Sequence, residues 1–98
     1  MELYEIMLDI AGVENDLAEG MVDFSFPKLM MAMKARHPAD ILDDIITEVG
    51  NQLFVDSDAK IPRDQVETLL NDLKSFQQEF QIVELLPCIY ALDEYLKQ

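Results

Sequence analysis

Apolar residues recur every three or four positions along most of the chain, and this spacing predicts amphipathic helices rather than strands. The first predicted helix covers residues 2–13. The polar stretch 14–20 is predicted to be a loop, because it is rich in Asn, Asp and Gly. A second helix is predicted to begin near Ser25 and to end at residues 36–38, because the residue before a proline avoids helical backbone angles.

A third helix is predicted from Asp40 to about Phe54, with a broad apolar face. The fourth begins at Pro62, and its apolar residues alternate in steps of three and four, as in a heptad seam that predicts a helix continuing to Leu86. The seam residues are Val66, Leu69, Leu73, Phe76, Phe80 and Val83. Pro87 then starts the last helix.

The seam has two interpretations, which the sequence leaves open. It can be the buried face of one amphipathic helix that lies on the core of its own chain. It can also be the contact surface of a homodimer. In either case the chain is predicted to be a small all-α domain of about five helices that spans residues 1–98.

Charge narrows the class of partner. Twenty acidic residues face seven basic ones, giving a net charge of −13. Nucleic acid and anionic membranes are therefore poor partners, because their phosphates repel such a surface. A basic protein surface, a basic helix or a cation is favoured, although the same charge also keeps a protein soluble.

The sequence contains few of the residues and motifs that are typical of enzyme active sites. The chain has one histidine, His37, and one cysteine, Cys88, and it has neither a phosphate-binding glycine loop nor a metal-spaced His/Cys set. We therefore expect a protein that is not an enzyme and needs no cofactor. A single cysteine, the lack of a signal-peptide pattern and the lack of an apolar run of about 20 residues predict a soluble cytoplasmic protein.

Residues 54–65 have the layout of a twelve-residue calcium loop. With Ile61 at the apolar eighth position, Asp56 and Asp58 take the third and fifth ligand positions. Upstream, the run Gly20, Val22, Asp23 and Phe24 and the apolar residues after it resemble the loop and following helix of a calmodulin-family hand. The chain thus resembles the EF-hand superfamily of calmodulin and the myosin light chains over residues 1–75.

The resemblance implies a paired EF-hand lobe with a two-stranded contact between its loops, and residues 76–98 as a C-terminal helical extension. The ligand set is degraded, because Phe54 and Gln65 stand where the family has its most important acidic ligands, and Leu17 interrupts the first loop. We therefore expect no calcium binding, with Asp56 and Asp58 as the only weak metal candidates.

Family members that have lost calcium act as light chains or adapters, which clasp a basic amphipathic helix of another protein. The resemblance implies the same role here. The groove would be lined by the flexible side chains of Met7, Met30, Met31 and Met33. An acidic rim would steer the basic helix in. Asp40, Asp43, Asp44 and Glu48 form an acidic helix face and are further candidates for binding a basic partner.

Two other functions compete with this interpretation. A small acidic helical protein can be an inhibitor, an immunity protein or an anti-defence protein that blocks a basic nuclease or nucleic-acid-binding surface. The stretches 39–54 and 89–98 also resemble helices of acyl carrier proteins. In that family a serine that carries phosphopantetheine follows the aspartate, and here Ile41 stands in its place.

Overall fold

The computed structural model describes residues 2–25 and 36–98, and all regular structure within them is helical. Three long helices come first, α1 (Leu3–Ala18), α3 (Pro38–Val55) and α4 (Arg63–Phe80). A short 3₁₀ turn, η1 (Val83–Leu85), leads into α5 (Leu86–Leu96). The predicted all-α class is confirmed, whereas the helix predicted after Ser25 lies outside the described residues. No helix of the described chain is long and apolar enough to cross a membrane.

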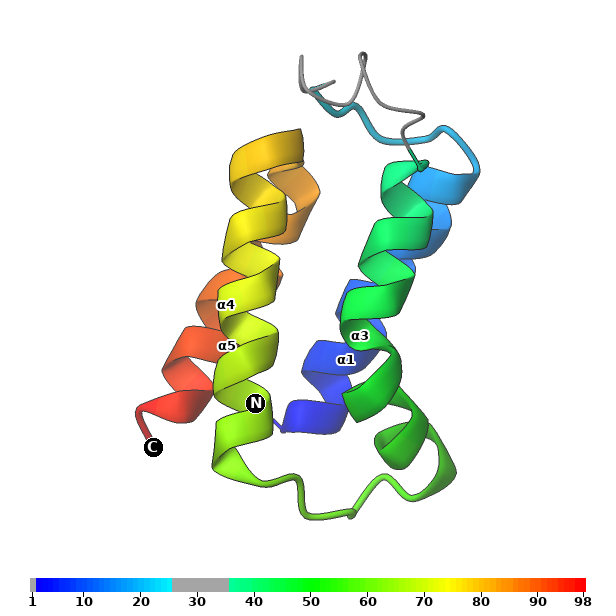
Figure 1. Cartoon of the computed structure of the whole chain (residues 1–98). Helices are drawn as coiled ribbons and strands as arrows, with labels where there is room; N and C mark the ends of the chain where they lie inside the picture. The colour runs from blue at the N-terminus through cyan, green and yellow to red at the C-terminus, as the bar shows by residue number, and fades with distance from the viewer. Residues whose placement is uncertain (1, 26–35) are drawn as a thin grey trace.

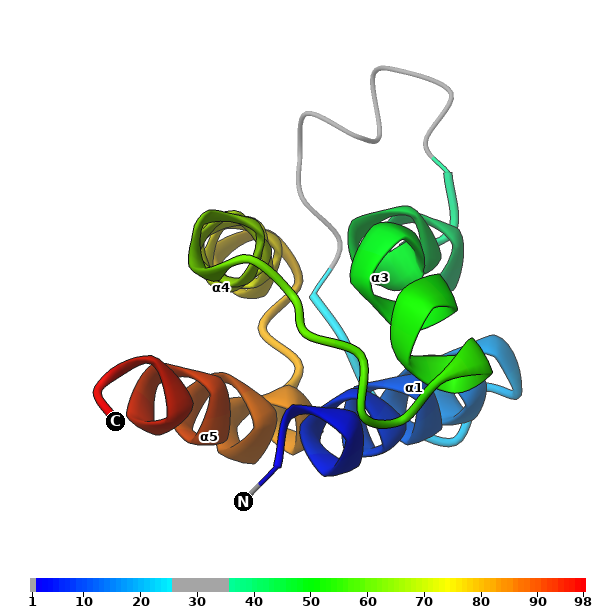
Figure 2. The same cartoon turned by 90° about the horizontal axis from the view of Figure 1, so that it is seen from below.

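Within the described residues, α1, α3, α4 and α5 form an up-down-up-down bundle (Figure 1). α1 and α5 lie in one layer, and α3 and α4 lie in the other (Figure 2). Each helix packs against two neighbours, so that the contacts run from α1 to α3, α4, α5 and back to α1. This ring encloses the core.

All four helices contribute to one apolar core, which contains no buried polar or charged residue among those described. Burial of apolar surface is therefore the main stabilising term, at about 25 cal/mol for each Å² removed from water. The largest fully buried side chains include Ile6, Met7, Ile10, Leu42, Leu53, Leu73, Ile82, Leu85 and Leu92.

The first helix is longer than predicted. It continues to Ala18, because Leu17 extends its apolar face by one turn and is buried. It ends in a Schellman motif: Gly20 has a φ of 73°, its N–H donates to the Leu17 carbonyl, and the Met21 N–H donates to the Asp16 carbonyl. The prediction of a loop over residues 14–20 was thus wrong for its first five positions.

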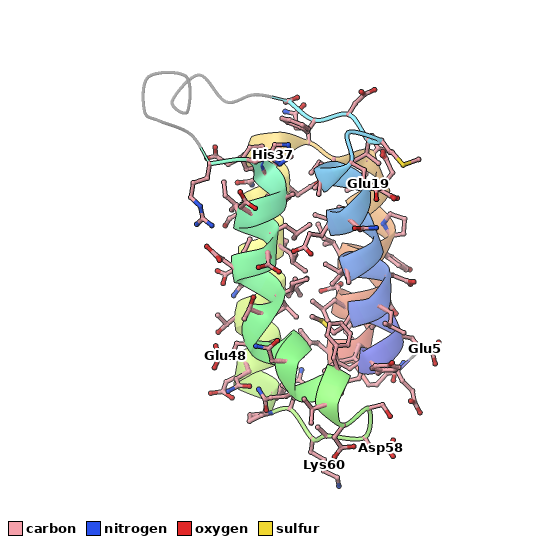
Figure 3. All side chains as sticks on the ribbon, turned by 90° about the vertical axis from the view of Figure 1, so that its right-hand side faces the viewer. Glu5, Glu19, His37, Glu48, Asp58 and Lys60 are labelled. Carbon is pink, nitrogen blue, oxygen red and sulfur yellow. The ribbon has the colours of Figure 1, made fainter. Side chains whose placement is uncertain are left out.

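The third helix begins two residues before the predicted Asp40. Pro38 occupies its first turn, where a missing N–H costs little. The Nδ1 atom of His37 accepts a hydrogen bond of 3.0 Å from the Ala39 N–H, so His37 is the N-cap (Figure 3). Residues 36–38, which were predicted to end a helix, therefore lie at the start of α3.

The fourth helix ends at Phe80, not at Leu86 as the seam predicted. Gln81 adopts a left-handed conformation with φ and ψ both at 53°. The Gln77 side chain closes the turn, because its amide donates to the Ile82 carbonyl at 2.7 Å and accepts from the Ile82 N–H at 3.1 Å. Ile82 is fully buried, which accounts for the reversal of the chain at this point.

The loops that the EF-hand resemblance would pair lie at opposite ends of α4. Residues 56–62 precede its first turn, whereas the Ser25 N–H donates to the carbonyl of Phe80 at the other end. The described chain also contains no strand. The implied two-stranded contact between Val22 and Ile61 is therefore not present.

The left-handed Gln81 provides a test of how α4 ends. Replacing Gln81 by Gly should raise the free energy of unfolding by about 0.5–1 kcal/mol, because glycine adopts this conformation without the steric cost of a Cβ. Gln78→Gly, one turn earlier in the helix, should instead lower it by about 1 kcal/mol. Urea denaturation followed by circular dichroism measures both. Destabilisation by both substitutions would contradict a chain reversal at Gln81.

Candidate functional site

A groove runs between α3 and α4, and all of its described lining residues belong to these two helices. It consists of two adjoining pockets of about 330 Å³ and 200 Å³, which share Ile45 and Asp72. Since α1 and α5 cover the other side of the same pair (Figure 2), the groove lies on the outer surface of the α3–α4 layer.

The section near the C-terminal end of α4 is apolar. Ile41 and Ile45 of α3 line it, and both are half-buried. From α4 it is lined by Phe76 and Phe80, whose ring centroids lie 4.7 Å apart. Phe24 packs edge-on against Phe80 from outside the two helices, at 6.4 Å. These aromatic contacts hold the floor of this section in place.

The section near the N-terminal end of α4 is acidic. It is lined by carboxylates from both helices: Asp44, Glu48, Asp64 and Asp72. Glu79 adds another carboxylate to the lining of the apolar section. Among the described residues no basic side chain lines either pocket, although Arg36 pairs with Asp44 at the edge of the acidic section. Side-chain hydrogen bonds join the two helices here, because Gln65 donates to Glu48 at 3.4 Å and accepts from Gln52 at 3.3 Å.

The predicted site residues fall into separate places. Asp44 and Glu48 lie on the groove, and Asp44 also pairs with Arg36. Met7 is fully buried in the core, so the prediction that it lines a groove was wrong. The other three predicted groove residues, Met30, Met31 and Met33, lie outside the described residues.

The remaining two residues of the predicted acidic helix face, Asp40 and Asp43, face α1 rather than α4. They line a small pocket of about 160 Å³ together with Glu14 of α1. The four carboxylates that looked like one helix face are therefore divided between two sides of α3.

Sequence reasoning missed the apolar floor of the groove. Phe76 and Phe80 belong to the predicted seam, and Ile41 and Ile45 belong to the broad apolar face predicted for the third helix, but the sequence did not predict that these residues line one groove. A signal was present, because the apolar face of α3 is too wide for one neighbour: Leu42 and Ile46 enter the core, whereas Ile41 and Ile45 remain half-exposed.

The proposed dimer seam is also part of the core. The five residues from Val66 to Phe80 that belong to it are at most 4% exposed. Val83 is the exception at 69%, because the chain has already turned away from α4. The rest of the seam is covered by the chain's own helices, and only Phe76 and Phe80 reach the surface, as the nearly buried floor of the groove.

The predicted calcium-loop aspartates take part in local backbone structure. The Asp58 N–H donates to Asp56 Oδ1 at 3.0 Å, which forms an Asx turn at the end of α3. No group of three potential metal ligands occurs among the described residues.

Glu14 is the one described side chain with a buried oxygen, Oε1, that has no hydrogen-bond partner. Its pKa is raised to about 7, mainly because burial disfavours the charged form. The neighbouring Asp43 and Asp40 raise it further, because two more negative charges face Glu14 across the α1–α3 contact.

This pKa predicts how stability depends on pH. A carboxyl whose pKa is higher in the folded state stabilises the fold below its unfolded pKa of 4.5, and this contribution is lost as the pH rises toward 7. Glu14→Gln should therefore raise the free energy of unfolding at pH 8 by about 1 kcal/mol, a value that allows for solvent screening. At pH 4 it should have little effect.

Thermal or urea denaturation at several pH values measures the difference. Glu19→Gln, at the exposed end of the same helix, is the control and should show no comparable rise between pH 4 and pH 8. An equal effect of Glu14→Gln at both pH values would contradict the raised pKa.

Comparison with known proteins gave no relative: no protein-family model, curated protein or solved structure matches the chain.

Proposed function

We propose that the protein is a non-enzymatic adapter whose α3–α4 groove binds a basic amphipathic helix of another protein. The observation that carries this proposal is the composition of the groove. Its floor is apolar, its rim bears carboxylates from both helices, and none of its described lining residues is basic.

The dimensions of the groove support a helical occupant. Its lining residues on α4 run from Asp64 to Phe80, a length of about 24 Å at 1.5 Å per residue. A partner helix of roughly 16 residues has the same length. Such a helix would bury its apolar face mainly against Ile41 and Ile45, above the nearly buried rings of Phe76 and Phe80, as helices do in other grooves.

Electrostatics favour a basic helix over a neutral one. The net charge of −13 attracts a cationic segment at long range, and the rim carboxylates pair with its Lys and Arg side chains at contact. Both effects are screened by salt, so binding should weaken as ionic strength rises.

Charge reversal at Glu48 tests the proposal. Glu48→Lys should weaken binding of a basic amphipathic peptide of 16 residues by roughly fivefold, because a rim charge then repels the peptide. Glu5→Lys changes the net charge equally on the opposite side of the molecule (Figure 3), and it is the matched control. Fluorescence anisotropy of a labelled peptide measures both affinities. Equal losses would mean that net charge, and not this groove, binds the peptide.

We further propose that binding does not depend on calcium. Asp56 already accepts the Asp58 N–H, and α3 and α4 are joined by side-chain hydrogen bonds that need no metal. The same peptide titration should give one affinity in micromolar calcium and in EDTA. Tighter binding in calcium would overturn this part of the proposal.

A cytoplasmic location suits the single cysteine. Cys88 is buried, and burial raises the pKa of its thiol to about 11, so it is a poor nucleophile and a poor disulfide partner.

An inhibitory role is the second candidate, and one observation favours it. Carboxylates face outward on both sides of α3, with Asp44 and Glu48 on the groove and Asp40 and Asp43 beside Glu14. A basic enzyme surface could cover both sides at once. Asp43→Lys would then weaken inhibition as much as Asp44→Lys, whereas an adapter that uses only the groove would be affected by Asp44→Lys alone.

A further inference from the structure

We infer that the α3–α4 groove selects a partner helix whose apolar and basic residues are segregated along its length, and that it sets the direction in which this helix lies. The inference rests on the proposed function and specifies its ligand. Large apolar side chains would lie at the Phe80 end of the groove, and Lys or Arg side chains at the Asp64 end.

The two sections of the groove differ in chemistry. The section at the Phe80 end exposes almost only apolar atoms. Ile41 and Ile45 are partly exposed there, whereas Phe76 and Phe80 lie behind them and are at most 4% exposed. The section at the Asp64 end is mostly polar and carries four carboxylates. Asp72 and Ile45 belong to both, so the change occurs near the middle of the groove.

Side chains, and not helix dipoles, produce this gradient. α3 and α4 run in opposite directions (Figure 1), so the negative end of α3 lies beside the positive end of α4 at the acidic section. The two dipoles largely cancel there. Among the described lining residues, the large charges that remain are the carboxylates, of which Asp44 is paired with Arg36.

The spacing of the two sections fixes the spacing of residues on the partner. On α4 the apolar section is centred on Phe76 and Phe80, and the acidic section on Asp64 and Thr68. These centres are twelve residues apart, or about 18 Å along the helix. A partner helix that follows the groove would carry two large apolar residues four positions apart, and two or three basic residues about twelve positions away on the same face.

A misplaced partner would lose binding energy at both ends. A Lys over the apolar floor would lose much of its hydration, and only Asp72 and Glu79 among the described lining residues of that section could pair with it. An apolar side chain over Glu48 and Asp64 would strip water from these carboxylates without pairing them. Selection thus includes a repulsive part as well as an attractive one.

Two peptides of identical composition, net charge and amphipathicity test the inference. In the segregated peptide the apolar anchors occupy one half of the groove-facing side and the lysines the other half. In the interleaved peptide the same residues alternate along that side. The segregated peptide should bind at least tenfold more tightly to the full-length protein in fluorescence anisotropy.

A spin label shows the direction of binding. A nitroxide at the apolar end of the segregated peptide should broaden the amide NMR signals of Ile41 and Phe80 more than those of Glu48 and Asp64. A label at the basic end should do the reverse. A segregated peptide with its basic half first should bind in the opposite direction, with the lysines again beside Glu48.

A pair of matched variants gives an independent reading. Ile41→Ser should weaken the segregated peptide severalfold and reduce its advantage over the interleaved one. Val83→Ser, which removes an exposed apolar side chain outside the groove, should change neither affinity.

The outcomes separate this inference from the proposed function. If both peptides bind equally, or if the label shows no fixed direction, the inference is wrong and the helix-binding function stands. If neither peptide binds, the proposed function fails and the inference fails with it.

Discussion

Burial of the apolar seam of α4 within its own chain is the constraint on which the rest of the structure depends. Five of its residues, from Val66 to Phe80, are nearly inaccessible and bring α4 against both α3 and α5. If this apolar face were exposed, packing against another apolar surface would be favourable. Here α3 and α5 of the same chain provide that surface. The turn at Gln81 then brings Ile82 and Leu85 into the same core.

The groove is a consequence of this packing. The apolar face of α3 is wider than its contacts with α1 and α4 can cover, so Ile41 and Ile45 are left half-exposed beside α4. In an isolated domain such exposed apolar residues contribute less to the free energy of folding than buried ones. A partner that covered them would gain the free energy of their burial. The phenylalanines behind them serve the core and the groove at once.

The apolar core determines where the acidic residues lie. Because the interior holds no buried charge among the described residues, the carboxylates gather on the outer sides of the helices. On α3 they divide between the groove and the contact with α1. There, Glu14 shows the energetic cost of partial burial beside Asp43 and Asp40, since its pKa rises to about 7.

Much of the fold follows from the sequence alone. Period and charge determine that the domain is helical and acidic, because amphipathic spacing and composition are local properties. The predicted ends of α1 and α4 were wrong in opposite directions. Burial of Leu17 makes α1 longer than predicted, and burial of Ile82 makes α4 shorter than predicted. Both effects come from contacts that local spacing does not contain. Only the tertiary structure decided that Met7 belongs to the core and that Asp44 and Asp43 face different neighbours, because the direction a side chain faces depends on which helix packs beside it.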